Sequence, residues 1–395
     1  MLHRYTFSNF QSFREQTEVS WLLDGRVPSA VWSAQADTQE RVSTVMAVIG
    51  PNASGKTGLL KPLLFVHWFV THSFATDPLA LLPYQPHAAS PAGEPSEFEV
   101  EVDLDGRLWR YTLRCTRERV LYEALYARHE RMRYVFVREW NAETQAYDVK
   151  QQDFGLAPSE ARKVRPNASL IATAAQYGVD LAKRIVSAQV WTNVHQLGRV
   201  IPDANQMLQA ASHFAAQEVE RRQLVQLLSA WDLGLSDLQM REQEATLPDG
   251  TSTKFWAPFG THRMANGKTF ELPFLMESSG TQGAFVLLSR LLPALECGGL
   301  AVVDEFENDL HPHMLEPILD LFASPLTNPR RAQLLFTCHA MEVLNIVHKS
   351  QVTLVEKDEL NESRAWRLDS VEGIRNDDNF YAKYMAGAYG AVPQL

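Results

Sequence analysis

Residues 50–57, with the sequence GPNASGKT, constrain the fold of this chain more than any other feature. They match the pattern GxxxxGK[ST], a glycine-rich turn that joins a buried strand to a helix. The preceding residues 44–49 (TVMAVI) form the short apolar run that is typical of a central parallel strand. In such a loop, backbone N–H groups and the helix dipole surround phosphates, the lysine reaches the β and γ oxygens, and the last hydroxyl binds Mg²⁺. The sequence therefore predicts a nucleotide site formed by Gly50, Pro51, Asn52, Ala53, Ser54, Gly55, Lys56 and Thr57.

A second element lies much later in the chain, where the apolar residues 300–303 (LAVV) end in the carboxylates Asp304 and Glu305. In a P-loop fold, the first carboxylate holds the Mg²⁺ shell and the second polarises the attacking water. Many buried strands end in acidic residues, so the pattern is weak alone and strong only together with the P-loop. We expect Thr57 and Asp304 to bind the metal, and Lys56 and Glu305 to act in catalysis.

Small residues begin a predicted helix shortly before the acidic strand, in the sequence ESSGTQ at residues 277–282. A helix start of this kind offers bare N–H groups and hydroxyls, which form an anion site of the same physical type as the P-loop. In isolation the motif is explained as well by an ordinary helix N-cap. Its place between the P-loop and the acidic strand favours a phosphate site formed by Ser279, Gly280, Thr281 and Gln282.

One histidine follows a predicted strand near the end of the chain. His339 comes directly after residues 333–337, so its imidazole is expected at the carboxyl edge of the sheet, where ligands of open α/β folds lie. A lone histidine is usually structural. Beside the three preceding elements, we interpret His339 as a catalytic contact to the γ-phosphate.

The remaining pattern predicts an α/β fold with a second, antiparallel lobe. Residues 98–113 alternate polar and apolar side chains around Asp105-Gly106, which predicts a β-hairpin that residues 133–139 and 147–150 extend. Between about residues 155 and 240 the period changes from two to nearly four, which predicts inserted helices. Strands are expected at 254–259, 270–274, 300–303, 333–337 and 351–355, and helices at 282–295, 312–322 and 341–348. This alternation implies a parallel sheet that is covered on both faces.

We expect one composite domain over residues 1–395, because α/β nucleotide-binding folds often use about 250 or more residues for one core with its insertions. Its predicted parts are an N-terminal β and P-loop part at 1–75, an antiparallel β lobe at 95–155, a helical insertion at 156–245, and a part at 246–395 that carries the small-residue helix start, the acidic strand and His339.

Composition narrows the partners and the compartment. The formal net charge of −10 argues against a general polyanion-binding surface, although it leaves a local basic patch open. The three cysteines stand far apart and outside any CxxC spacing, so they suggest neither a disulfide framework nor a zinc site. The start of the chain lacks the apolar core of a secretory signal, and the longest apolar run is too short to span a bilayer. A cytoplasmic protein without a membrane partner is expected.

These four elements, in this order, resemble ABC-type ATPase heads of the SMC, RecF and OLD group. The resemblance covers nearly the whole chain, with NFQSF at residues 9–13 near the start and the segment 384–393 near the end. Within that group the chain looks most like the short bacterial ATPases of two-gene abortive-infection systems, such as AbiL and PARIS. Gln11 stands where SMC and RecF heads often carry a basic residue, and no glutamine between Thr57 and Gln151 is a clear candidate for the Q-loop.

The resemblance implies a mixed central sheet and a head-to-head homodimer, with two ATP molecules held between the protomers. The P-loop, Asp304 and Glu305 of one chain would face residues 279–282 of the other. Such a second anion site has no phosphate to bind in one chain, but in a dimer it would cap the γ-phosphate and exclude water. ATP binding would then join two copies, and hydrolysis would loosen them.

Three functions follow from this resemblance and from the residues. The first is an ATP-hydrolysing sensor or scaffold in phage defence that acts with a separately encoded effector, since the chain after His339 is too short for the Toprim nuclease domain of OLD proteins. The second is a RecF-like or SMC-like ATPase that clamps DNA in repair or chromosome maintenance. The third, a P-loop kinase or GTPase, is poorly supported, because neither needs SSGTQ or His339.

Overall fold

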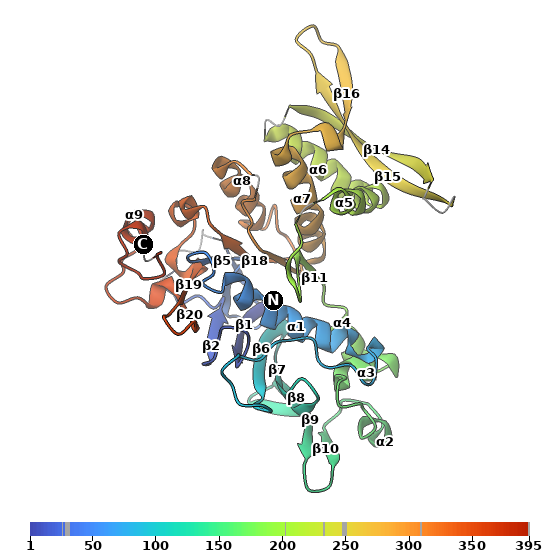
Figure 1. The fold of residues 1–395 in the computed structure, drawn as a ribbon, viewed down its shortest axis with the longest axis vertical. Coiled ribbons are helices and arrows are strands. Elements are labelled where there is room, and N and C mark those ends of the chain that lie inside the picture. The colour runs from blue at the N-terminus through green and yellow to red at the C-terminus, as the bar shows by residue number, and fades with distance from the viewer. Residues whose placement is uncertain are drawn as a thin grey trace.

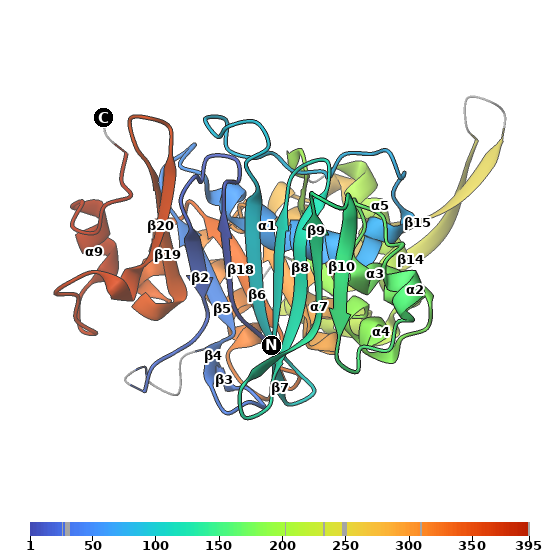
Figure 2. The same ribbon diagram turned by 90° about the horizontal axis from the view of Figure 1, so that it is seen from below.

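The computed structural model describes residues 1–25, 27, 32–201, 203–231, 234–246, 251–308 and 310–393. In this part of the chain two large sheets lie face to face, and helix α1 (Lys56–His72) packs between them (Figures 1 and 2). One sheet has six strands and carries the P-loop, and the other has seven antiparallel strands. The expected α/β fold is therefore confirmed, with the mixed sheet and the antiparallel lobe as separate layers.

The six-stranded sheet has the order β11-β17-β18-β5-β19-β20, and all its neighbours are parallel except the last pair. Successive residues of its central strand β5 enter different cores. Val45, Ala47 and Ile49 pack with helices α7 and α8, whereas Met46 and Val48 pack with α1 and the seven-stranded sheet. The apolar run thus forms a strand covered on both faces, as predicted. The bounds are β5 Val45–Ile49, β11 Val190–Thr192, β17 Leu300–Val303, β18 Gln333–Cys338, β19 Val352–Lys357 and β20 Ser363–Arg367.

The seven-stranded sheet has the order β10-β9-β8-β7-β6-β1-β2. The hairpin predicted around Asp105-Gly106 is confirmed, because β6 and β7 pair up to Leu104 opposite Arg107. Strand β1 lies inside the sheet, since it pairs with β2 on one side and with β6 on the other. The bounds are β1 Leu2–Ser8, β2 Thr17–Ser20, β6 Ser96–Leu104, β7 Arg107–Cys115, β8 Val120–Arg128, β9 Met132–Asn141 and β10 Ala146–Gln151.

The helical prediction for residues 155–240 holds in part. Helices α2 to α6 lie there, but β11, the short strands β12 and β13, and the start of β14 interrupt them, so the segment predicted as a helical insertion at 156–245 is not helical at these places. The strand partners account for the two longer cases: β11 pairs with the distant strand β17, and β14 forms a hairpin with β15, the strand that follows it. The bounds are α2 Pro158–Ala161, α3 Leu170–Gln176, α4 Asp180–Val186, α5 Ala204–Ala216, α6 Glu218–Ala230, β12 Val194–His195, β13 Gly198–Arg199, β14 Leu235–Thr246, β15 Ser252–Arg263 and β16 Thr269–Pro273.

Helix α7 (Ser279–Cys297) connects this outer part to the six-stranded sheet. It packs on α5 and α6, and the strands β14 and β15 project beyond them as a long arm (Figure 1). The helix expected at 312–322 is broken into α8 and the 3-10 turns on either side of it, and the helix expected at 341–348 is shortened to one 3-10 turn. The remaining elements are β3 Ser33–Gln35, β4 Arg41–Ser43, α8 Leu315–Leu319, α9 Phe380–Met385 and the 3-10 turns Ser73–Ala75, Phe274–Met276, Pro312–Met314, Asp320–Phe322, Met341–Asn345, Lys349–Gln351 and Leu368–Ser370.

None of the helices in the described residues combines the length and the apolar character needed to cross a bilayer.

A buried ion pair ties the antiparallel sheet to helix α3, which packs on α1. Glu123 on β8 and Arg138 on β9 are both fully buried, with Oε2 and Nη1 3.3 Å apart. Glu123 also accepts hydrogen bonds from the Ser169 hydroxyl and the Leu170 N–H, while Arg138 donates to the backbone carbonyls of residues 164, 165 and 168. Ser169 in turn caps α3. This network fixes the layer on which α1 rests.

Arg138→Met should strongly destabilise the protein, because it leaves the Glu123 carboxylate buried without its cation. We expect the free energy of unfolding to fall by about 3–5 kcal/mol. Urea unfolding followed by circular dichroism measures the effect, with Arg133→Met, an exposed position on the same strand, as the control. Equal stability of the two variants would contradict the structural role of this pair.

Candidate nucleotide-binding site

The P-loop joins the carboxyl end of β5 to the start of α1, as predicted. Its backbone passes close to β19, since a Cβ at Gly50 would lie only 2.0 Å from the carbonyl oxygen of Val355. Gly55 has a φ of +111°, which side chains disfavour, and no side chain caps the helix behind it. The first N–H groups of α1 are therefore available to an anion in a cradle that only glycine allows.

Residues from both ends of the chain hold this loop in place. The Ser363 hydroxyl donates to the carbonyl oxygen of Ser54 at 2.6 Å and lies 2.8 Å from the hydroxyl of Ser12. The Ser363 N–H donates to the carbonyl of Ser12 at 2.7 Å. The hydroxyl of Ser54 itself is buried and has no hydrogen-bond partner, so a polar group remains for a phosphate oxygen.

The Lys56 ammonium lies against the loop backbone. Its Nζ donates to the carbonyl oxygens of Gly50 and Pro51, both at 2.8 Å, and the residue is 6% exposed. Burial lowers the pKa of Lys56, and the carboxylate of Asp304 is the largest opposing influence. A phosphate next to this ammonium would favour its charged form in the same way.

Asp304 lies at the tip of β17, where two threonines hold both of its carboxylate oxygens. The Thr57 hydroxyl donates to Oδ2 at 2.7 Å, and the Thr337 hydroxyl donates to Oδ1 at 2.6 Å. Thr57 and Asp304, predicted to share a metal, are thus in direct contact across 247 residues of sequence. A hydroxyl beside a carboxylate at the end of a P-loop is a donor set that fits Mg²⁺.

Asn193, which the sequence did not single out, fixes the backbone of the same aspartate. It follows β11, and its side-chain amide donates to the carbonyl of Asp304 at 2.9 Å and accepts from the Asp304 N–H at 2.8 Å. The preceding residues VWT carried a strand signal, but the helical period of the segment obscured it. Asn193 is a polar residue at the carboxyl end of a parallel strand, which is where ligand sites of such sheets lie.

Glu305 has an unusual backbone and an unexpected partner. Its φ is +51°, and its N–H donates to the Thr337 hydroxyl at 2.8 Å. Its Oε2 lies 2.8 Å from Nη2 of Arg199, which comes from the short hairpin β12–β13. Nothing in the sequence pattern had pointed to Arg199.

His339 follows β18 at the carboxyl edge of the sheet, where it was expected. Its side chain is exposed, and within the described residues its ring has no hydrogen-bond partner. Its backbone N–H donates to Oε1 of Glu307 at 2.6 Å. The imidazole is therefore free to meet a ligand above the sheet edge.

The segment 279–282 begins α7, and Gly283 directly after it lines a small cavity together with Arg199 and Glu305. Ser278 caps the helix by accepting the Thr281 N–H at 3.2 Å, and Gln282 donates its amide to the carbonyls of residues 275 and 277. Among the described residues no hydrogen bond joins 279–282 to the P-loop or to the acidic pair. The helix start thus has an ordinary N-cap. If residues 279–282 bind a phosphate, it would be one that the P-loop of another molecule holds.

Comparison with known proteins gives a family model and a fold. Residues 45–345 match the model described as "AAA domain, putative AbiEii toxin, Type IV TA system". A search of curated proteins finds no match. Among solved structures, an SMC head bound to the C-terminal winged-helix domain of ScpA is similar with a TM-score of 0.50 at 10% identity, covering 94% of this chain and 99% of that one. An SMC head domain from Thermotoga maritima gives 0.45 at 12% identity, with 93% and 98% covered.

Gly50→Ala should abolish binding at the P-loop, because its Cβ would force the loop away from β19. Binding of a fluorescent ATP analogue measures the loss. Gly25→Ala is the matched control, since a Cβ there meets nothing within 4 Å. Retention of parental affinity by Gly50→Ala would show that the loop does not need this close approach.

Proposed function

The chain belongs to the family of AAA domains described as putative AbiEii toxins of type IV toxin–antitoxin systems, and from that membership we propose that it is an ATP-hydrolysing switch. One observation carries the proposal: the P-loop hydroxyl of Thr57 and the strand-end carboxylate of Asp304 are in hydrogen-bond contact. Lys56 directly precedes Thr57, and Glu305 directly follows Asp304. Together the four residues supply the groups that phosphoryl transfer requires.

The residues divide into binding and catalytic groups. The P-loop N–H groups, the free Ser54 hydroxyl and Lys56 would hold the triphosphate of ATP. Mg²⁺, held by Thr57 and Asp304, would supply positive charge to the phosphate oxygens. Thr337 holds the side chain of Asp304, and Asn193 holds its backbone. These hydrogen bonds would orient the carboxylate toward the metal before the metal binds.

Glu305 would accept the proton of the attacking water. Arg199 holds its Oε2, so Glu305 must either release this partner or use its second oxygen. Phe306 and Asn308 follow in a loop that, with Gly283 on α7, lines a small cavity beside the pair. His339, with its free ring, would contact the γ-phosphate.

A second copy of the chain would complete the site. Helix α7 starts at Ser279, Gly280, Thr281 and Gln282, and within the described residues no hydrogen bond joins this helix start to the P-loop of the same chain. Ser278 and Ser279 are exposed at this helix start. We infer that it caps the γ-phosphate bound by a partner, so that ATP joins two copies head to head.

Lys56→Ala should remove nucleotide binding altogether, because no other ammonium lies within the loop. Titration with a fluorescent ATP analogue measures this, and thermal melting confirms that the variant is folded. Parental affinity in a folded Lys56→Ala protein would contradict the assignment of the loop.

Glu305→Gln should retain ATP and lower turnover by about 100-fold, since a general base typically contributes this much or more. Size-exclusion chromatography with light scattering should then show a dimer with ATP and a monomer without it. Turnover at the parental rate would refute Glu305 as the base, and a monomer in saturating ATP would refute the shared site.

We further infer a role in abortive infection, together with a separately encoded effector. The family description and the resemblance to two-gene defence ATPases support it. Co-purification with the product of the neighbouring gene tests the partnership. Incubation of the lone chain with Mg²⁺ and plasmid or tRNA tests the division of labour, because robust cleavage would mean that this chain is itself the effector.

A further inference from the structure

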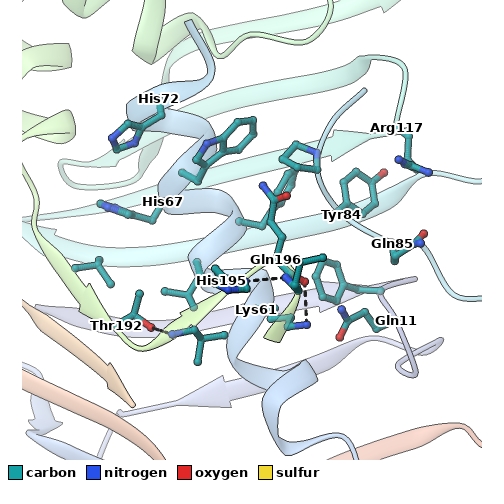
Figure 3. A pocket seen from close by; sticks show the side chains of 18 residues that line it. Gln11, Lys61, His67, His72, Tyr84, Gln85, Arg117, Thr192, His195 and Gln196 are labelled. Atoms are coloured by element: carbon teal, nitrogen blue, oxygen red, sulfur yellow. Dashed lines mark hydrogen bonds between the residues drawn. The ribbon is translucent and has the colours of Figure 1, made fainter. Parts of the chain in front are cut away.

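A cavity of about 570 Å³ lies beside α1, outside the residues assigned to ATP (Figure 3). Its walls come from one face of α1, the loop at residues 83–85, the turn after β7, and residues 190–197 of β11 and the hairpin β12–β13. A volume of this size falls in the range of about 300–1,000 Å³ that is typical of small-molecule sites. The chemistry of its walls indicates which ligand would fit.

Aromatic rings form a large part of the wall. Phe65 and Trp68 stack along α1 with centroids 6.2 Å apart, and Phe65 lies 4.9 Å from Tyr84. Tyr84 in turn stacks on Phe10 at 6.1 Å. Such rings give a planar ligand apolar surface and π-faces on which to stack.

The charge of the lining is entirely positive. None of its 18 residues is acidic, although the chain has 47 Asp and Glu, and Lys61 and Arg117 both line the cavity. Within the described residues the Arg117 side chain makes no hydrogen bond or ion pair, and its Nε is buried without a partner. Lys61 donates only to the carbonyl of Gln196, at 3.1 Å. An anion would satisfy both groups.

Two side-chain amides complete the polar chemistry. Gln11 and Gln85 lie on the same side of α1 as Tyr84 and Arg117 in Figure 3. Neither amide has a hydrogen-bond partner among the described residues. Amides present both donors and acceptors, so they match the mixed polar edge of a nucleobase.

We propose that this cavity binds a nucleoside monophosphate group, with the base against the aromatic wall and the amides, and the phosphate at Lys61 and Arg117. The group could belong to a free mononucleotide or to the 5′-phosphorylated end of a nucleic acid. The site is separate from the P-loop and goes beyond the ATPase function proposed above.

The cavity is physically linked to the catalytic carboxylates through one short hairpin. His195 and Gln196 line the cavity, Asn193 before them holds Asp304, and Arg199 after them holds Glu305. A phosphate at Lys61 competes with the Gln196 carbonyl for the ammonium. Movement of this hairpin would change the hold of Arg199 on Glu305, so an occupied cavity would alter the rate of ATP hydrolysis.

The binding test uses the full chain with Lys56→Ala, which removes the P-loop as a competing site. Isothermal titration calorimetry is run with each of the four ribonucleoside monophosphates, and separately with 5′-phosphorylated tetranucleotides, to distinguish the two sources. Arg117→Ala should weaken binding by about tenfold or more, and Trp68→Leu by about fivefold or more. Arg119 lies in the same turn as Arg117, but its side chain packs on the ring of Trp140. The Arg119→Ala variant should therefore bind the probe as the parent does.

Binding of either probe, lost in Arg117→Ala and kept in Arg119→Ala, supports the site, and the probe that binds identifies the source. Absence of binding by both probes at millimolar concentration overturns the proposal, as does equal affinity of the two arginine variants. Neither outcome depends on ATP hydrolysis, so failure here is distinct from failure of the ATPase function.

The linkage is tested with the parental P-loop and saturating ATP. Addition of the bound probe should change kcat, and Arg199→Ala should abolish that change while its affinity for the probe stays parental. An unchanged kcat at saturating probe would refute the link through the hairpin, and so would a response that survives Arg199→Ala.

Discussion

The hydrogen bonds to Asp304 are the constraint on which the site depends. Its two carboxylate oxygens are held by Thr57 and Thr337, and its backbone by Asn193. Thr337 lies near the end of β18, Thr57 follows β5 and its P-loop, and Asn193 follows β11. The carboxylate therefore keeps its place only when the ends of these strands and of β17 are in register. Because Asp304 is paired through both carboxylate oxygens and through its backbone, loss of register would leave several buried polar groups unsatisfied at once. The sheet and the site therefore form together.

The features that local pattern predicted are those whose signal is contained in a short stretch. The P-loop follows its apolar strand directly, the hairpin at Asp105-Gly106 has its turn and both strands within one segment, and the acidic pair ends a continuous apolar run. Each rests on the alternation of side chains or on glycine geometry, which depend little on distant residues. The contact of Thr57 with Asp304 joins two such motifs, because the P-loop and the acidic pair each end a parallel strand at the same edge of one sheet.

The features that were missed depend on strand pairing rather than on local period. β11 is only three residues long and lies in a segment of helical period, so its distant partner β17 decides its conformation. The strand β14 is determined by β15, the strand that follows it in a hairpin. Asn193 directly follows β11 and Arg199 ends the hairpin after it, so neither position is recognised as part of the site unless β11 is recognised as a strand. Tertiary context overrides local preference most easily in short strands at a sheet edge.

Two ion pairs in the molecule differ in burial, and burial decides how easily each pair can be separated. The pair of Arg138 and Glu123 is fully buried. Separating the two side chains would leave an unpaired charge in the interior, so the pair stays intact. The side chains of Arg199 and Glu305 are 17% and 37% exposed, and water can replace either partner. A partly exposed pair of this kind contributes only about 0–1 kcal/mol. A ligand of modest affinity would therefore suffice to separate Arg199 from Glu305, the carboxylate that we propose as the general base.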